Sequence, residues 1–139
     1  MGYTHYFRQH KILNENEWTS IYEAYQKILN EYSEIIEDSS SNINPEKYIN
    51  FNGIEEDAHE NFMITNYSCP SFNFCKTARK EYDIVVCLFL LYINENHSGI
   101  LEISSDGDWD EWMSARQEYK RIFNKIPNCP WDSTEEEDE

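Results

Sequence analysis

Residues 84–93 form an almost continuous apolar run in a chain that is otherwise rich in charge. The length of the run and its leucines favour a helix, although Val85 and Val86 would also suit a strand. A helix without a polar face has to be covered on every side. The run is only about half as long as a segment that spans a bilayer. We therefore predict a buried helix at residues 82–94 and no membrane partner.

The composition is acidic and aromatic. The 139 residues include 27 Asp and Glu against 11 Lys and Arg, a formal net charge of -16, and 15% of them are aromatic. A chain of this length suits one domain with a substantial core, and its aromatic content argues against a disordered chain. Affinity for nucleic acid depends on a cationic surface. We therefore predict no direct nucleic-acid binding, while the charge fits a basic partner or mimicry of a polyanion.

Periodic patterns place the other elements. Residues 2–8 predict a first strand in which alternate side chains, including His5 and Phe7, share one face. Asn14, with a glutamate three residues later, forms a capping box that opens an amphipathic helix ending near Asp38. Further short strands are predicted at residues 47–51, 61–67 and 100–104, and a last helix runs from Asp108 to before Pro127.

Short strands mixed with two or three helices predict an α+β fold. We expect a small, mostly antiparallel sheet with the helices packed on it, as a single domain over residues 1–131. Residues 132–139 hold six acids and predict a disordered acidic tail.

Three cations, Lys76, Arg79 and Lys80, stand within five residues just before the apolar run. We refer to them as the basic cluster. Helix N-termini attract anions, and on a helix positions 76 and 80 would share a face. The basic cluster is therefore a predicted ligand-binding site for a phosphate or carboxylate, which Arg79 would bind bidentately. The alternative is that these cations neutralise nearby acids, namely Glu81, Asp83 and the acidic loop at residues 55–60.

Polar residues at the ends of predicted elements extend this candidate site. His5, Asp57 and His59 combine imidazole and carboxylate groups, which suit a base, a metal ligand or a pH-sensitive hydrogen bond. Ser105 and Asp106 lie in a turn after a predicted strand, where hydroxyl and backbone N–H groups can face a ligand. We predict that all five line the same pocket as the basic cluster. The alternatives are a structural hydrogen-bond network for the histidines and an ordinary N-capped turn for the other two.

The four cysteines, Cys69, Cys75, Cys87 and Cys129, lack the short spacing of a zinc knuckle. No apolar segment follows a basic N-terminus, so we expect no secretory signal and free thiols in a reducing cytoplasm. Cys87, inside the apolar run, is expected to be a small buried residue. A zinc site built from the other three cysteines with a histidine stays open as an alternative. Because no common hydrolase, P-loop or metalloenzyme motif is present, the sequence predicts no catalytic residue, metal or cofactor.

Four segments together resemble a family of small proteins from phages and bacterial prophages. The segments read MGYTHY at residues 1–6, NGIEEDAHE at 52–60, FCKTARKEYD at 74–83 and SSDGDWDEW at 104–112. Members of that family tend to begin MGYTHYW and to carry FCKTARK-P-YD and SSDG-W-EW segments, whereas this chain has Phe7 and Glu81 where Trp and Pro are usual. The resemblance implies a phage-borne accessory protein in the cytoplasm of a bacterial host cell. Small phage proteins of this kind often counter host defence, by blocking an effector or by binding a nucleotide signal.

The sequence leaves three functions open. The first is a non-catalytic counter-defence module whose pocket binds an anionic, nucleotide-like small molecule. The second is an acidic inhibitor, similar to an anti-CRISPR protein or a nucleic-acid mimic, that blocks a host defence protein which binds nucleic acid. The third is a small hydrolase or phosphodiesterase. Polar motifs at element ends favour a pocket, whereas the net charge favours the inhibitor. The oligomeric state stays open.

Overall fold

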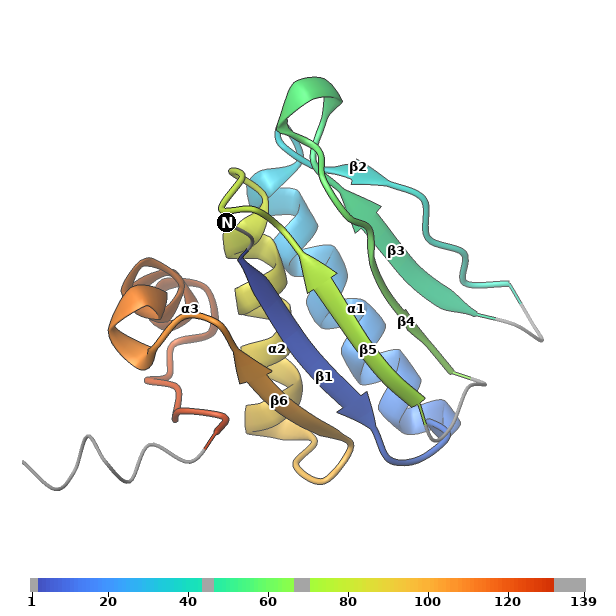
Figure 1. Ribbon diagram of the computed structural model, residues 1–139. Helices are drawn as coiled ribbons and strands as arrows, with labels where there is room; N and C mark the ends of the chain where they lie inside the picture. Colours follow the sequence, from blue (N-terminus) through green and yellow to red (C-terminus); the bar gives the residue numbers. More distant parts are fainter. Residues whose placement is uncertain (1–2, 44–46, 67–70, 132–139) are drawn as a thin grey trace, which may run out of the picture.

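Three α-helices and two three-stranded antiparallel sheets make up the part of the chain that the computed structural model describes, residues 3–43, 47–66 and 71–131 (Figure 1). The predicted α+β class is therefore confirmed. One continuous set of buried side chains joins both sheets and all three helices. The predicted acidic tail, residues 132–139, lies outside the described residues.

The first sheet has β1 at its centre, and both of its neighbours run antiparallel to it. In spatial order its strands are β5 (Ser71–Lys76), β1 (Thr4–Gln9) and β6 (Leu101–Ser105). His5 and Phe7 are buried and Arg8 is exposed. This confirms the predicted alternation, since successive side chains of a strand point to opposite faces.

The second sheet lies beside the first. In spatial order its strands are β2 (Glu37–Asp38), β3 (Tyr48–Asn52) and β4 (Phe62–Thr65). Inward side chains such as Phe51 and Phe62 are buried and belong to the common core. The backbone N–H of Glu60 donates to the carbonyl oxygen of Lys76 at 3.2 Å, so the segment leading into β4 meets the end of β5.

Helices α1 (Glu15–Tyr32) and α2 (Asp83–Asn96) pack against each other behind the strands (Figure 1). Every residue from 85 to 91 is at most 2% exposed. The buried helix predicted from the apolar run is therefore confirmed. The capping box at the start of α1 is also confirmed, because the side chain of Asn14 accepts from the N–H of Glu17 and the carboxylate of Glu17 accepts from the N–H of Asn14.

Helix α1 ends at Tyr32, so the predicted end near Asp38 is wrong. Glu37 and Asp38 pair instead with β3 and form β2. Their backbone groups are satisfied by the sheet, and this long-range pairing overrides the helical pattern of the local sequence.

Helix α3 (Met113–Phe123) packs on α2 and follows a 3-10 turn, Trp109–Trp112. The predicted capping box is confirmed, since Asp108 and Glu111 satisfy each other's backbone N–H groups. The helix ends at Asn124, which adopts a left-handed conformation. Such a residue is a common helix terminator.

Strand β5 contradicts the prediction that the basic cluster begins a helix, and the sequence analysis placed no strand at these residues. Phe74 is exposed and Cys75 is buried, as expected for a strand. Lys76 is the last residue of this strand, and α2 begins only at Asp83. The three cations therefore do not share a helix face, because Lys76 is paired with Thr4 of β1 and belongs to a strand.

Candidate functional site

His5 occupies the buried face of β1 and is fully inaccessible to solvent. Its register places it opposite Cys75 of β5 on one side and Ser105 of β6 on the other. Because facing residues of paired strands point to the same side of a sheet, these side chains all turn toward the helix layer. His5 is therefore a polar group at the junction of sheet and helices.

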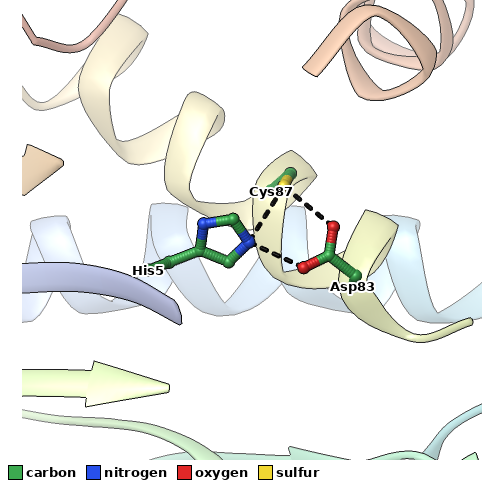
Figure 2. Close-up of side chains that lie close together, drawn as sticks. All are labelled: His5, Asp83 and Cys87. Atoms are coloured by element: carbon green, nitrogen blue, oxygen red, sulfur yellow. Dashed lines mark hydrogen bonds and ion pairs between the residues drawn. The ribbon is translucent and has the colours of Figure 1, made fainter. Parts of the chain in front are cut away.

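Two side chains of α2 meet His5 there. Figure 2 shows Asp83 and Cys87, which lie four residues apart on one face of the helix, converging on the imidazole. Oδ1 of Asp83 lies 2.7 Å from Nε2 of His5. Sγ of Cys87 lies 3.6 Å from the same nitrogen and 3.6 Å from Oδ2 of Asp83. We call these three residues the His5 cluster.

Neighbouring polar groups hold the His5 cluster in place. Oγ of Ser105 lies 2.8 Å from Nδ1 of His5, and the hydroxyl of Thr77 donates to Oδ1 of Asp83 at 2.5 Å. The rings of Tyr3 and Trp112 each contact the imidazole edge-on, with centroids 5.1 Å away. Both ring nitrogens of His5 thus have a hydrogen-bond partner, and aromatic rings flank the imidazole.

Asp83 carries a negative charge in this cluster. Burial raises the pKa of its carboxyl, but the hydrogen bond and charge of His5, with bonds from Thr77 and Cys87, outweigh burial and bring the pKa below its usual value. The ionised carboxylate accepts from Nε2–H of His5, and Oγ of Ser105 bonds to Nδ1 on the other side of the ring. Burial raises the pKa of the Cys87 thiol well above its usual value, so the sulfur carries a proton and is not an activated nucleophile.

Ser105, His5 and Asp83 form a hydrogen-bonded chain like that of a serine hydrolase. In this protein the hydroxyl oxygen of Ser105 also accepts from the backbone N–H of Gly107 at 3.0 Å and from Nε1 of Trp112 at 3.3 Å. Both lone pairs of that oxygen are therefore in use. This arrangement favours a structural role for Ser105, as the residue that ties the turn after β6 to β1.

Asp106 also ties that turn to β1. Its carboxylate accepts from the backbone N–H of Thr4 and from the hydroxyl of Tyr6, each at 3.1 Å. His5 and Ser105 thus meet, while Asp106 bonds to the two neighbours of His5 in β1. The carboxylate partner of His5 is Asp83, however, and not Asp57.

Asp57 and His59 are exposed on the connection between β3 and β4. Asp57 belongs to a 3-10 turn, Glu55–Asp57, and the backbone N–H of His59 donates to Oδ1 of Asn52 at 2.9 Å. His5, by contrast, is fully buried. The sequence grouped the exposed pair Asp57 and His59 with the buried His5, because the spacing of residues along the chain does not show which of them are buried.

The basic cluster spans the last residue of β5, Lys76, and the tight connection to α2, which holds Arg79 and Lys80. Ala78 and Arg79 both have positive φ there, 54° and 59°. The guanidinium of Arg79 lies 3.9 Å from the ring centroid of Tyr3 and pairs with Glu111 at 3.1 Å. Nζ of Lys80 donates to the carbonyl oxygen of Glu56 at 3.1 Å. The ion pair of Arg79 with Glu111 supports the alternative in which the cations neutralise nearby acids, whereas Lys80 reaches only a backbone carbonyl of the loop at residues 55–60.

The sequence did not reveal a concave acidic surface beside this connection, which we call the acidic hollow. Its volume is about 210 Å³, and its lining consists of Glu34, Ile35, Ile54, Glu55, Glu56, Asp57 and Glu81. Within the described ranges, none of its five carboxylates forms an ion pair. The turn after α1, the loop after β3 and the residues before α2 each supply part of the lining. No local motif could indicate it, because three separate segments build it.

Comparison with known proteins finds no family model, no curated protein and no solved structure that matches the chain. The resemblance to phage and prophage proteins therefore stays an expectation. Among the described residues, no helix is long and apolar enough to cross a membrane.

Proposed function

We propose that this protein is an acidic binding module, and that it inhibits a partner protein by docking the acidic hollow on a basic surface of that partner. The observation that carries this proposal is the set of five carboxylates around one concavity, with no ion pair among the described residues. Concave surfaces lined by one sign of charge concentrate the electrostatic potential and attract opposite charge.

The shape and chemistry of the acidic hollow fit a lysine or arginine side chain. Its volume of about 210 Å³ is below the roughly 300–1,000 Å³ typical of pockets for small ligands. Ile35 and Ile54 offer apolar surface for the aliphatic stem of such a side chain, and the carboxylates surround its charged head. The sign of the charge opposes a phosphate at this place.

Two further observations favour this function over the anion pocket predicted from the basic cluster. Arg79 already contacts Tyr3 and Glu111, and Lys80 already donates to the loop at residues 55–60. The first turn of α2, where an anion was expected, already holds an acidic residue, Asp83, whose carboxylate bonds to His5. A carboxylate in the first turn satisfies the helix dipole without a ligand.

The net charge of -16 and the resemblance to phage proteins support a partner of a particular kind. That partner is a host defence protein that binds nucleic acid through a basic groove. An acidic protein docked in such a groove would compete with the phosphate backbone for the same cations. Inhibition then needs no catalytic residue in this chain.

Binding to a fluorescently labelled arginine-rich peptide tests the proposal. The test variant carries Glu34→Gln, Glu56→Gln and Glu81→Gln in the acidic hollow. We expect its affinity to fall about tenfold, because three exposed ion pairs of about 0.5 kcal/mol each sum to about 1.5 kcal/mol. Fluorescence anisotropy at fixed salt measures the change.

The control carries Glu23→Gln, Glu102→Gln and Asp110→Asn, three exposed acids outside the acidic hollow. It removes the same number of charges, and its affinity should stay within about twofold of the original protein, since net charge alone acts weakly at physiological salt. Equal losses in both variants would show that binding follows net charge and would reject the acidic hollow as the docking site.

A further inference from the structure

We infer that the His5 cluster is a binding site for one zinc ion per chain. Three different donor groups, an imidazole nitrogen, a carboxylate oxygen and a sulfur, point at one another in the interior, and their ligand atoms all lie within 4.8 Å of one another. Zinc accepts this mixture of donors, whereas magnesium and calcium prefer oxygen alone. The inference rests on residues separate from the acidic hollow and is independent of the proposed function.

Two of the three distances in the His5 cluster suit a metal as well as they suit weak hydrogen bonds, and the third, 2.7 Å from Nε2 of His5 to Oδ1 of Asp83, has to lengthen when an ion enters. Sγ of Cys87 lies 3.6 Å from Nε2 of His5 and 3.6 Å from Oδ2 of Asp83. Zinc bonds of about 2.3 Å to sulfur and about 2.0–2.2 Å to nitrogen and oxygen hold tetrahedral ligand atoms about 3.5 Å apart. An ion can therefore sit between the three groups with only small side-chain shifts.

Backbone elements and neighbouring side chains already position the donors. Asp83 and Cys87 lie one turn apart on α2, and β1 holds His5 rigidly between two strands. Ser105 contacts Nδ1 of His5, which leaves Nε2 for a metal. A partner of this kind on the second ring nitrogen is typical of metal-binding histidines, because it fixes the orientation of the ring.

Binding requires a defined movement of protons. The Nε2 proton of His5 is replaced by the metal, and the imidazole stays neutral by carrying its proton on Nδ1. Nδ1–H then donates to Oγ of Ser105, which accepts it in place of the 3.3 Å bond from Nε1 of Trp112. The Cys87 thiol loses its proton to solvent and bonds as a thiolate, so one proton leaves per ion bound. The side chain of Asp83 is 22% exposed, which gives ion and proton a way in and out and leaves room for water as a fourth ligand.

Cobalt(II) is the probe that tests this site, because a cobalt–thiolate bond gives a charge-transfer absorption band that nitrogen and oxygen ligands do not give. The chain is freed of metal with a chelator and titrated with cobalt(II). We expect the band to saturate at one equivalent in the original protein and to disappear on adding zinc. Cys87→Ser should abolish the band.

Cys75→Ser is the matched control. Cys75 is equally buried and lies opposite His5 on β5, but its sulfur donates to the carbonyl oxygen of Glu60. This variant should keep the full band. Asp83→Asn serves as a second variant, expected to weaken cobalt binding at least tenfold. A band that persists in Cys87→Ser, or no band in the original protein with excess cobalt, would overturn the inference.

Discussion

Oδ1 of Asp83 accepts a 2.7 Å hydrogen bond from Nε2 of His5, and this contact joins the first turn of α2 to the central strand of the first sheet. The two residues are 78 positions apart in the chain. His5 is fully buried, so no water replaces a lost partner easily. The contact should therefore matter for the stability of the metal-free protein.

Asp83→Asn should lower the free energy of unfolding by about 1–3 kcal/mol, the usual value of a buried hydrogen bond to a charged group. Urea denaturation in the presence of a chelator measures this without a contribution from metal. Asp110→Asn, an exposed substitution of the same type, should change stability by less than about 0.5 kcal/mol. If the two variants were equally stable, the His5–Asp83 contact would not tie α2 to the sheet.

Arg79→Ala should leave the fold intact and reduce stability by less than about 1 kcal/mol. The pair with Glu111 is exposed and the contact with Tyr3 is a single cation–π interaction, so each contributes little. The affinity for the arginine-rich peptide should not fall. Urea denaturation measures the stability, and fluorescence anisotropy measures the peptide affinity. A nucleotide that binds the original protein but not Arg79→Ala would instead support the anion-binding pocket.

Gly53→Ala should change the shape of the acidic hollow without altering any of its carboxylates. A Cβ at this position would lie 2.2 Å from the carbonyl oxygen of Asp57, a backbone atom that cannot rotate away. We expect a loss of about 1–3 kcal/mol in stability and weaker peptide binding, because the loop at residues 54–57 has to shift. Gly99→Ala is the control: its φ of 92° makes alanine strained, but nothing lies within 4 Å, so it should affect stability alone.

His97 should titrate below the ordinary histidine pKa of 6.5, because burial lowers its pKa more than the charge of Glu17 raises it. The folded protein then binds fewer protons at this site than the unfolded chain. Its contribution to stability is complete above about pH 6.5 and decreases as the pH falls below that value. An NMR titration of the imidazole gives the folded-state pKa, and a value at or above 6.5 would contradict the expectation.

The parts of the fold governed by local patterns were predictable from the sequence. The capping boxes at Asn14 and Asp108, the alternation in β1 and the buried helix α2 all follow from short-range periodicity. Strands β2 and β5 were not predictable in this way. Their residues pair with partners far along the chain, and this long-range pairing outweighs local preference.

The candidate sites, like the fold, were predictable only where local patterns determine them. The sequence singled out His5 and Ser105, which do meet, but it did not pair His5 with Asp83. The spacing of Asp83 and Cys87, four residues apart at the start of an apolar helix, was the available signal. The spacing indicates a cluster only once the topology is known, because it is the topology that brings His5 of β1 onto that end of α2. The acidic hollow needed three separate segments and left no local signal at all.

NMR spectroscopy of the ¹⁵N-labelled protein, titrated with the arginine-rich peptide, tests the proposed docking site most directly. Backbone amide signals should shift and saturate at Glu34, Ile54, Glu56 and Glu81, which line the acidic hollow. The amides of Glu23, Glu102 and Asp110, exposed acids elsewhere, should stay within the range of unaffected residues. Shifts spread evenly over acidic residues on all faces, or centred on the basic cluster, would contradict the proposal.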